Sequence, residues 1–302
     1  MFIKYILSFC FLFYIQGCDY DTKTKWVMLN VNELDKQGDA HIISKGATHF
    51  MIDTGQQYYV RSVVIPYLRK HRITHLKGVL ITHPHFDHYG GTKDLIESGI
   101  SIDTLYMNMP TEAQMKREWW GGYYSDLISI RNSAKKHHIK IVPVKRGDIY
   151  SFDKESYIKI LYAYDGIHTP VGTTDINDMS VIAMFHDGDN KFLFTGDLNR
   201  KLGGYLATHA KDIKADILKF PHHGTEGFAP STFFDTVSPK VVLVPGPSYL
   251  WCSDRSKRAR ELVKNNHYTA YVNGFHGNVT VLSNGKSYEI FTQNKSEMIC
   301  EK

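Results

Sequence analysis

The sequence predicts an α/β fold, and two observations support this class. Apolar, strand-like runs alternate with segments of helical periodicity, as in residues 48–55, 60–71, 78–81 and 92–98. The composition, 42% hydrophobic and 13% aromatic in 302 residues, is sufficient for a packed core and excludes a disordered chain. This length suits one large domain or two small ones.

The elements of the first half follow in a regular order. Strand-like runs occupy residues 26–31, 39–43 and 48–55. A helix is predicted over 60–71, with a kink or local break at Pro66, which has no backbone N–H. The run 78–81 and a helix that closes at Gly99 come next. This order of strand, helix, strand and helix predicts an α/β sandwich.

Metal-binding side chains follow the run 78–81. Three histidines and one aspartate lie within six positions: His83, His85, Asp87 and His88. Imidazole and carboxylate together suit zinc, and less specifically manganese or iron. His83 and His85 are two positions apart, so on an extended chain they point the same way. A turn after His85 directs Asp87 and His88 to a second ion, so the pattern predicts two neighbouring metal sites.

Two strand-like runs of the second half also end in ligand-type residues. The run from Lys191 ends at Asp197, and the run from Asp216 ends at His222 and His223. An anionic oxygen between two cations offsets their repulsion, so a carboxylate belongs in a two-metal site. The sequence therefore predicts that Asp197 and one of these histidines complete the centre.

The pattern at 83–88 resembles the signature of the metallo-β-lactamase superfamily. Residues 37–40, 52–55 and 221–224 are similar to elements of one branch, the hydrolase domain of ComEC DNA-uptake proteins and its stand-alone relatives. The resemblance extends from about residue 26 to 292 and implies one domain with a four-layer αββα sandwich. His85 stands where the redox di-iron members carry glutamate, which favours a hydrolase.

The resemblance also implies roles for single residues. Asp197 would bridge both metals, and Asp53 would support the metal loop without binding metal. One of His222 and His223 would complete the second site, and the other would donate to substrate or act as general acid. Which histidine does which stays open.

The chain departs from the family pattern at two places. Many members carry a third histidine for the first metal where this chain has Asp175-Ile176-Asn177-Asp178. Asp178 is the first candidate for that ligand, with Asn177 and Asp175 less favoured. The branch usually has a second histidine where this chain has Cys252.

The predicted function is a binuclear metal-dependent hydrolase that uses a metal-activated hydroxide. We expect zinc, with manganese as the alternative, and catalytic roles for Asp87, His222 and His223. Because two cations neutralise charge on several oxygens, a phosphoester is the expected substrate, and nucleic acid and phosphocholine-type esters are both candidates. The alternative is a metal- or ligand-binding lipoprotein of the same fold with weakened catalysis, as Cys252 and the missing histidine suggest.

The N-terminus predicts export. Residues 5–15 form an apolar run, and Ile15-Gln16-Gly17-Cys18 resembles a bacterial lipoprotein cleavage box. We therefore expect a signal peptide at 1–17, a lipidated Cys18 with a tether to residue 25, a domain at 26–292 and a tail at 293–302. The protein would be anchored in the cell envelope and act outside the cytoplasm. The spacing of the four cysteines indicates neither a disulfide framework nor a cysteine–zinc site.

Residues 107–138 leave two interpretations open. Trp119-Trp120-Gly121-Gly122-Tyr123-Tyr124 is a dense aromatic cluster with glycines at its centre. It is either a lid or substrate wall, where aromatic rings stack on a base or sugar, or part of a helix pair that covers the core.

Overall fold

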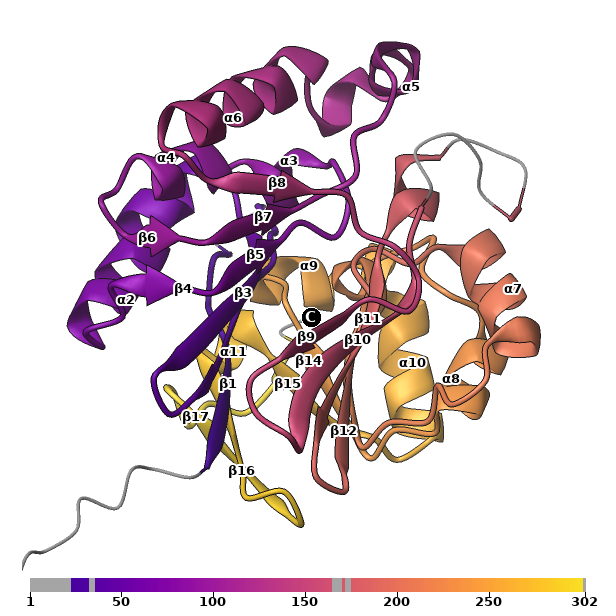
Figure 1. The fold of residues 1–302 in the computed structure, drawn as a ribbon. Helices are drawn as coiled ribbons and strands as arrows, with labels where there is room; N and C mark the ends of the chain where they lie inside the picture. The colour runs from indigo at the N-terminus through magenta and orange to yellow at the C-terminus, as the bar shows by residue number, and fades with distance from the viewer. Residues whose placement is uncertain (1–22, 33–35, 165–169, 172–174, 301–302) are drawn as a thin grey trace, which may run out of the picture.

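The computed structural model describes residues 23–32, 36–164, 170–171 and 175–300. The predicted signal peptide and Cys18 lie outside these residues. Two sheets stack face to face, with helices on their outer faces (Figure 1). This four-layer arrangement in one domain confirms the predicted αββα sandwich.

The first sheet has eight strands in the order β17-β16-β1-β2-β3-β5-β7-β8. Strands β3, β5, β7 and β8 run parallel to one another, and the remaining pairs, including β2 with β3, are antiparallel. The bounds are β1 Thr24–Met28, β2 Ala40–Lys45, β3 Thr48–Thr54, β5 Gly78–Leu80, β7 Thr104–Tyr106, β8 Lys140–Val142, β16 Val279–Ser283 and β17 Tyr288–Thr292.

The second sheet has seven strands in the order β15-β14-β13-β12-β11-β10-β9, with β12 to β15 parallel. The bounds are β9 Ile149–Ser151, β10 Ser156–Tyr162, β11 Ile182–Asp187, β12 Asn190–Phe194, β13 Ile217–Lys219, β14 Val241–Val244 and β15 Thr269–Val272. A separate small sheet pairs β4 (His75–Leu76) with β6 (Ser101–Ile102).

Helical elements of the first half lie against the first sheet, and α7, α8 and α10 lie against the second (Figure 1). The first set is α1 Gln57–Tyr59, η1 Val60–Val64, α2 Ile65–Lys70, α3 Phe86–Tyr89, α4 Thr92–Ile96, α5 Glu112–Arg117, η2 Trp119–Gly121 and α6 Tyr124–Lys136. The second set is η3 Ile176–Met179, α7 Arg200–His209, η4 Pro221–Gly224, α8 Ser231–Val237, α9 Ser248–Cys252, η5 Asp254–Ser256, α10 Lys257–Asn265 and α11 Asn273–His276.

The core between the two sheets is rich in aromatic side chains. Trp26 of the first sheet is fully buried and contacts Phe192 and Phe194 of the second, with ring centroids 5.7 and 4.6 Å apart. Two further apolar clusters fill the spaces between each sheet and its helices. Strands buried on both faces carry continuous apolar runs, so β14 is apolar throughout and β13 is apolar up to Lys219 at its end.

The predicted kink near Pro66 takes a specific form. Residues 60–64 form a π-helical turn, and α2 begins at Ile65 with Pro66 in its first turn. In an α-helix each backbone N–H donates to the carbonyl four residues earlier, and proline has no N–H to donate. The wider π-helical turn accommodates this missing hydrogen bond.

The cysteine prediction was wrong, because Cys252 and Cys300 form a disulfide with 5.3 Å between their Cα atoms. The two residues are 48 positions apart, and the fold brings the segment after β17 against the end of α9. Their spacing carries no signal for this pairing.

Across the described ranges, no helix combines the length and apolar character needed to cross a bilayer.

Candidate metal centre

The candidate site lies where parallel strands of both sheets end. Strands β3 and β5 are parallel neighbours in the first sheet, as β12 and β13 are in the second. Asp53 is the second-last residue of β3, and His83 to His88 follow β5. Asp197 follows β12, and His223 follows β13. The carboxyl ends of parallel strands commonly form binding sites, because their loops converge at one edge.

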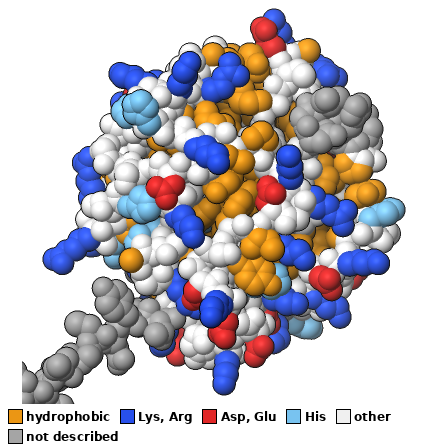
Figure 2. All heavy atoms as spheres, viewed as in Figure 1, with side chains coloured by type: hydrophobic (Ala, Val, Ile, Leu, Met, Phe, Trp, Pro, Cys, Tyr) orange, Lys and Arg blue, Asp and Glu red, His pale blue; other side chains and the backbone are white. Residues whose placement is uncertain are grey.

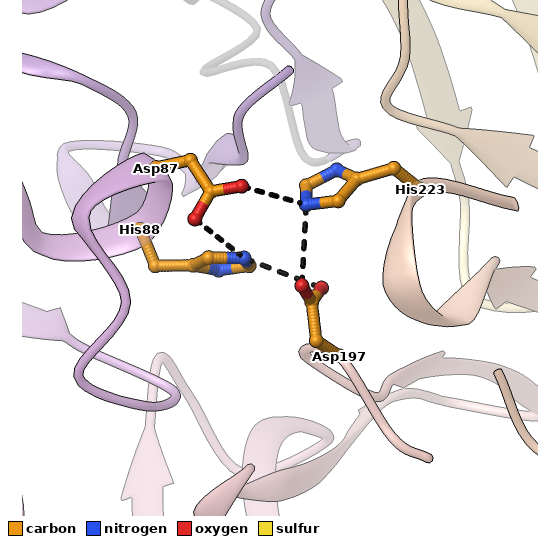
Figure 3. Close-up of side chains that lie close together, drawn as sticks. All are labelled: Asp87, His88, Asp197 and His223. Carbon is orange, nitrogen blue, oxygen red and sulfur yellow. Dashed lines mark ion pairs between the residues drawn. The ribbon is translucent and has the colours of Figure 1, made fainter. Parts of the chain in front are cut away.

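Asp87, His88, Asp197 and His223 form a four-residue group whose ligand atoms all lie within 4.8 Å of one another. Figure 3 shows the four side chains pointing toward one another. His223 Nε2 lies 3.2 Å from Asp87 Oδ2 and 3.3 Å from Asp197 Oδ2. His88 Nε2 lies 3.2 Å from Asp197 Oδ1. These are two imidazoles and two carboxylates around one point.

His83, His85 and Asp197 form a second group, the His83–His85 group, within the same 4.8 Å limit. His83 Nε2 lies 3.2 Å from His85 Nδ1 and 3.9 Å from Asp197 Oδ2. Asp197 belongs to both groups, which is the position that the family resemblance implies for a bridging carboxylate.

Hydrogen bonds at Nδ1 of His88 and His223 determine that Nε2 of each ring faces the four-residue group. His88 Nδ1 lies 2.8 Å from Asp53 Oδ2, and His223 Nδ1 lies 2.8 Å from the Pro245 carbonyl oxygen. A carbonyl or carboxylate oxygen only accepts, so each Nδ1 carries a hydrogen and donates it. In the neutral rings the lone pairs therefore lie on Nε2, facing Asp197. Such outer partners are typical of histidine ligands to metals.

The hydroxyl group of Thr82 determines the tautomer of His83 in the same way. Thr82 Oγ1 donates to Asp53 Oδ2 at 2.7 Å, so its hydrogen is already used. His83 Nδ1, 3.2 Å from that hydroxyl, is then the donor, and its Nε2 has the free lone pair. Asp53 also accepts from the Thr82 backbone N–H at 2.8 Å. Asp53 thus contacts His88 directly and His83 through Thr82, and with Asp39 and His88 it forms a third group within the same 4.8 Å limit, so its purely supporting role stays a prediction.

Three buried polar atoms that face one another accept or donate no hydrogen bond: His88 Nε2, His223 Nε2 and Asp197 Oδ1. Unpaired buried polar atoms are costly and are rare in folded proteins. A divalent cation between them would satisfy all three, and imidazole with carboxylate is the donor set that suits zinc or manganese. The residues present therefore fit a metal ion.

The charges of the group act strongly on one another. Burial alone would lower the pKa of His223, but the charges of Asp197, Asp87 and Asp39 outweigh it and raise this pKa to about 10. The pKa of His88 is raised well above its ordinary value for the same reason. Burial opposes ionisation of Asp197, yet the two histidines hold its pKa well below its usual range.

The sequence analysis assigned no role to Asp39 and Lys219. Lys219 is buried at the end of β13, and its Nζ pairs with Asp39 Oδ2 and donates to the Gly196 carbonyl at 2.7 Å. The same Nζ lies 3.6 Å from Asp197 Oδ1. Burial would lower the pKa of Lys219, but the Asp39 and Asp197 charges raise it. A lysine within the apolar run 217–220 was the feature of the sequence that could have indicated a buried charge near the metal centre.

His222 and Asp178 belong to neither of these two groups. His222 lines the cavity described below, whereas the buried His223 joins the four-residue group. Both histidines have a positive backbone φ, 52° and 54°. Residues other than glycine rarely adopt this conformation, and it occurs often at functional sites. Asp178 is buried and its pKa is raised to about 6, mainly by burial. Neither described group includes it, and its role as a ligand stays a prediction.

A cavity of about 1010 Å³ opens over the two groups, and His85, Asp87 and Asp197 reach its surface. Basic side chains also line it, namely Lys36, Arg117, Lys201 and Arg255. One wall comes from the cap segment, which we define as residues 111–123 and which contains α5 and η2.

Each of the two interpretations of residues 107–138 describes a different part of this segment. Trp119 and Trp120 are 65% and 67% exposed, so they do not cover the core. Trp120 lines the cavity as a substrate wall would. Leu127 and Ile130 of α6, by contrast, pack in the core on the first sheet.

The comparisons with known proteins agree with this geometry. Residues 35–228 match the family model of the metallo-beta-lactamase superfamily, and the chain belongs to this superfamily. It is 25% identical over 183 residues to ComE operon protein 3 of Bacillus subtilis, covering 60% of this chain and 21% of that protein. It is 24% identical over 220 residues to the uncharacterized protein YcaI of Escherichia coli, covering 70% of this chain and 24% of that protein.

A solved structure shows the same fold. The Zn²⁺-bound PqqB of Methylobacterium extorquens aligns with a TM-score of 0.52 at 12% identity, covering 82% of this chain and 97% of that one. Both ComEC-like relatives are much longer than the matched region, and the chain spans less than a quarter of the length of either, 21% and 24%. The superfamily fold and a candidate metal site are thus established for this chain.

Proposed function

We propose that the protein is a metal-dependent phosphodiesterase that binds two divalent ions, zinc in the first place and manganese as the alternative. The observation that carries this proposal is the pair of ligand groups that share Asp197 beneath a cavity with a basic rim. Ions bound there would supply Lewis acidity and activate a water for attack on the ester. The protein residues hold these ions and position the substrate.

The rim of the cavity favours an anionic substrate. Lys36 and Arg117 line one part of it, and Arg255 pairs with Glu226 at 3.2 Å (Nε to Oε1) in another. Arginine and lysine bind phosphate oxygens by charge and hydrogen bonds. On the face seen in Figure 2, Lys and Arg side chains are scattered among other residues and form no continuous stripe. Recognition of a phosphoester at the cavity is therefore better supported than binding along a broad basic surface.

His222 and Trp120 would contact the organic part of the substrate. Burial lowers the pKa of His222, so at neutral pH its ring is neutral and donates a hydrogen bond. The exposed indole of Trp120 stacks on a nucleobase and also attracts a quaternary ammonium group. Nucleic acid and phosphocholine-type esters are thus both candidate substrates.

We further propose that the protein acts outside the cytoplasm as a lipoprotein anchored through Cys18. The sequence at 15–18 supports the anchor, and the Cys252–Cys300 disulfide supports an oxidising compartment. Mass spectrometry of the membrane fraction would find a diacylglyceryl group on Cys18. Recovery of unmodified Cys18 in the soluble fraction would contradict the anchor.

The test of activity is hydrolysis of bis-p-nitrophenyl phosphate by the full chain after loading with Zn²⁺ or Mn²⁺. We expect metal-dependent turnover that disappears in a His85→Ala/Asp87→Ala variant. A matched control is His209→Ala, which changes an exposed histidine at the end of α7. Single-stranded DNA and a phosphocholine ester would then be compared as substrates.

Two outcomes would contradict the proposal. Two bound ions without turnover on any phosphoester would indicate a metal-binding protein of the same fold. No bound metal would remove the central claim, because both ligand groups would then lack the function assigned to them.

A further inference from the structure

Glu118 lies where the cap segment meets the metal centre. It follows α5 directly, and its side chain is 13% exposed at the edge of the cavity. Oε2 lies 3.1 Å from His85 Nε2, and Oε1 accepts the backbone N–H of Ile176 at 2.9 Å. Both oxygens therefore have partners, one in the metal motif and one in the segment that precedes β11.

The hydrogen bond to Glu118 determines which nitrogen of His85 faces the His83–His85 group. A carboxylate oxygen only accepts a hydrogen bond, so Glu118 Oε2 accepts and His85 Nε2 carries the hydrogen. His85 Nδ1, 3.2 Å from His83 Nε2, then holds the lone pair. His88 stands in the same relation to Asp53 on the other side of the centre.

Gly121 holds the same imidazole from a second direction. A Cβ at this position would lie 2.4 Å from His85 Cδ2 and 2.7 Å from His85 Nε2. Such distances are not tolerated, so the cap segment packs on the ring at the closest approach that a glycine allows. The orientation of His85 thus depends on Glu118 and Gly121 together.

We infer that Glu118 is a positioning residue that fixes the tautomer and orientation of His85 for the ion at the His83–His85 group. This inference rests on the proposed metal centre. A carboxylate on the outer nitrogen makes a histidine ligand more basic and holds its ring in place, and loss of such a partner commonly lowers metal affinity by about 10–100-fold. Trp120 on the same segment lines the cavity, so substrate contacts and the orientation of His85 depend on one piece of chain.

The experiment is a zinc titration of the full chain against a chromophoric chelator, for the wild type, Glu118→Gln and a control. Glutamine keeps the shape of Glu118 and removes its charge. The control is Glu112→Gln, at the start of the helix that precedes Glu118, where Glu112 is exposed and pairs with Lys116 at 2.8 Å. We expect Glu118→Gln to weaken one ion by about 10–100-fold, and the other ion and the control to be unchanged.

A second readout does not depend on bound metal. Nitrogen NMR of ¹⁵N-histidine-labelled, metal-free protein should show His85 as the Nε2–H tautomer in the wild type and a mixture in Glu118→Gln. Gly121→Ala, which leaves Glu118 intact, should also weaken a single ion, because the added methyl group displaces the His85 ring.

The outcomes separate this inference from the proposed function. A wild type that binds no zinc would contradict the metal centre itself. A wild type that binds two ions, with Glu118→Gln and Gly121→Ala binding both ions equally well, would overturn the role of Glu118. An unchanged His85 tautomer in Glu118→Gln would do the same.

Discussion

The two ligand groups share Asp197 but differ in how they are held. The four-residue group takes Asp87 and His88 from α3, Asp197 from the segment after β12 and His223 from η4 after β13, and its histidines are buried. The His83–His85 group has three residues, and the outer nitrogen of His85 bonds to Glu118 on the cap segment. One group is therefore built on the edges of two sheets, and the other depends partly on a connecting segment. Sites on strands are held more precisely than sites on loops, so the two groups should respond differently to change.

The largest expected effect tests what the groups have in common. Asp197→Asn keeps the size of the side chain and removes the charge that both groups share, so both ions should be lost. The rate of hydrolysis should then fall by more than about 10²-fold, which is the largest usual effect of losing a residue that only hydrogen-bonds to a metal ligand. Elemental analysis after dialysis and the bis-p-nitrophenyl phosphate rate measure this. Asp189→Asn, in the exposed turn between β11 and β12, is the control, and two retained ions in Asp197→Asn would refute a shared role.

The next effect should separate the groups. His85→Ala leaves the four-residue group complete, so this variant should keep one tightly held ion. His223→Ala removes a ligand from the better enclosed group and leaves neither group with more than three residues. Its remaining zinc should be held more weakly, as calorimetric titration would show. Equal residual affinities in the two variants would mean that the groups are equivalent.

The groups should also differ in their protons. Because the pKa of His223 is raised to about 10 and that of His88 is also raised, both rings are protonated at pH 7 without metal. Burial and the charge of His88 lower the pKa of His83, which is neutral already. Binding at the four-residue group should therefore release protons, and its affinity should fall as pH falls.

Calorimetry in buffers of different ionisation enthalpy counts these protons. His83 adds none, so the ion at the His83–His85 group should bind with less proton release. Metal binding without any proton release at pH 7 would contradict the raised pKa values of His88 and His223.

The smallest effect on the metal sites concerns the disulfide. Cys300→Ser should lower the free energy of unfolding by about 2–4 kcal/mol, the usual contribution of a disulfide. Trp251, next to Cys252, lies 3.3 Å from the place that a Cβ on Gly224 would occupy, directly after His223. Any loss of metal affinity should therefore fall on the four-residue group. Denaturant unfolding with and without reductant tests this, and equal stability in the wild type and the variant would contradict it.

Local patterns were sufficient to predict the α/β class and much of the candidate site, and the family resemblance implied the four-layer sandwich. The apolar runs that end at Asp197 and His223, and the pattern from His83 to His88, place polar ligands directly after buried strands. Such signals lie within a few residues of one another and need no knowledge of distant contacts.

The parts that were missed depend on contacts between distant segments. Glu118 meets His85 from 33 positions away, and no motif surrounds it. Asp39 and Lys219 meet from opposite halves of the chain, although a lysine in an apolar strand was a visible sign. The choice between His222 and His223 depended on backbone angles of the turn after β13, which the residue types leave open.

The division of ligands between the two sheets has a thermodynamic consequence. The first half of the chain supplies His83 to His88, and the second half supplies Asp197 and His223. An ion bound by both halves is a crosslink between them and stabilises only the state in which the sheets are docked. At a free ion concentration 100 times the dissociation constant, such linkage adds about 2.7 kcal/mol for each ion. Resistance to proteolysis would then follow the free metal concentration around the protein, and a chelator would loosen the contact between the sheets before any strand unfolds.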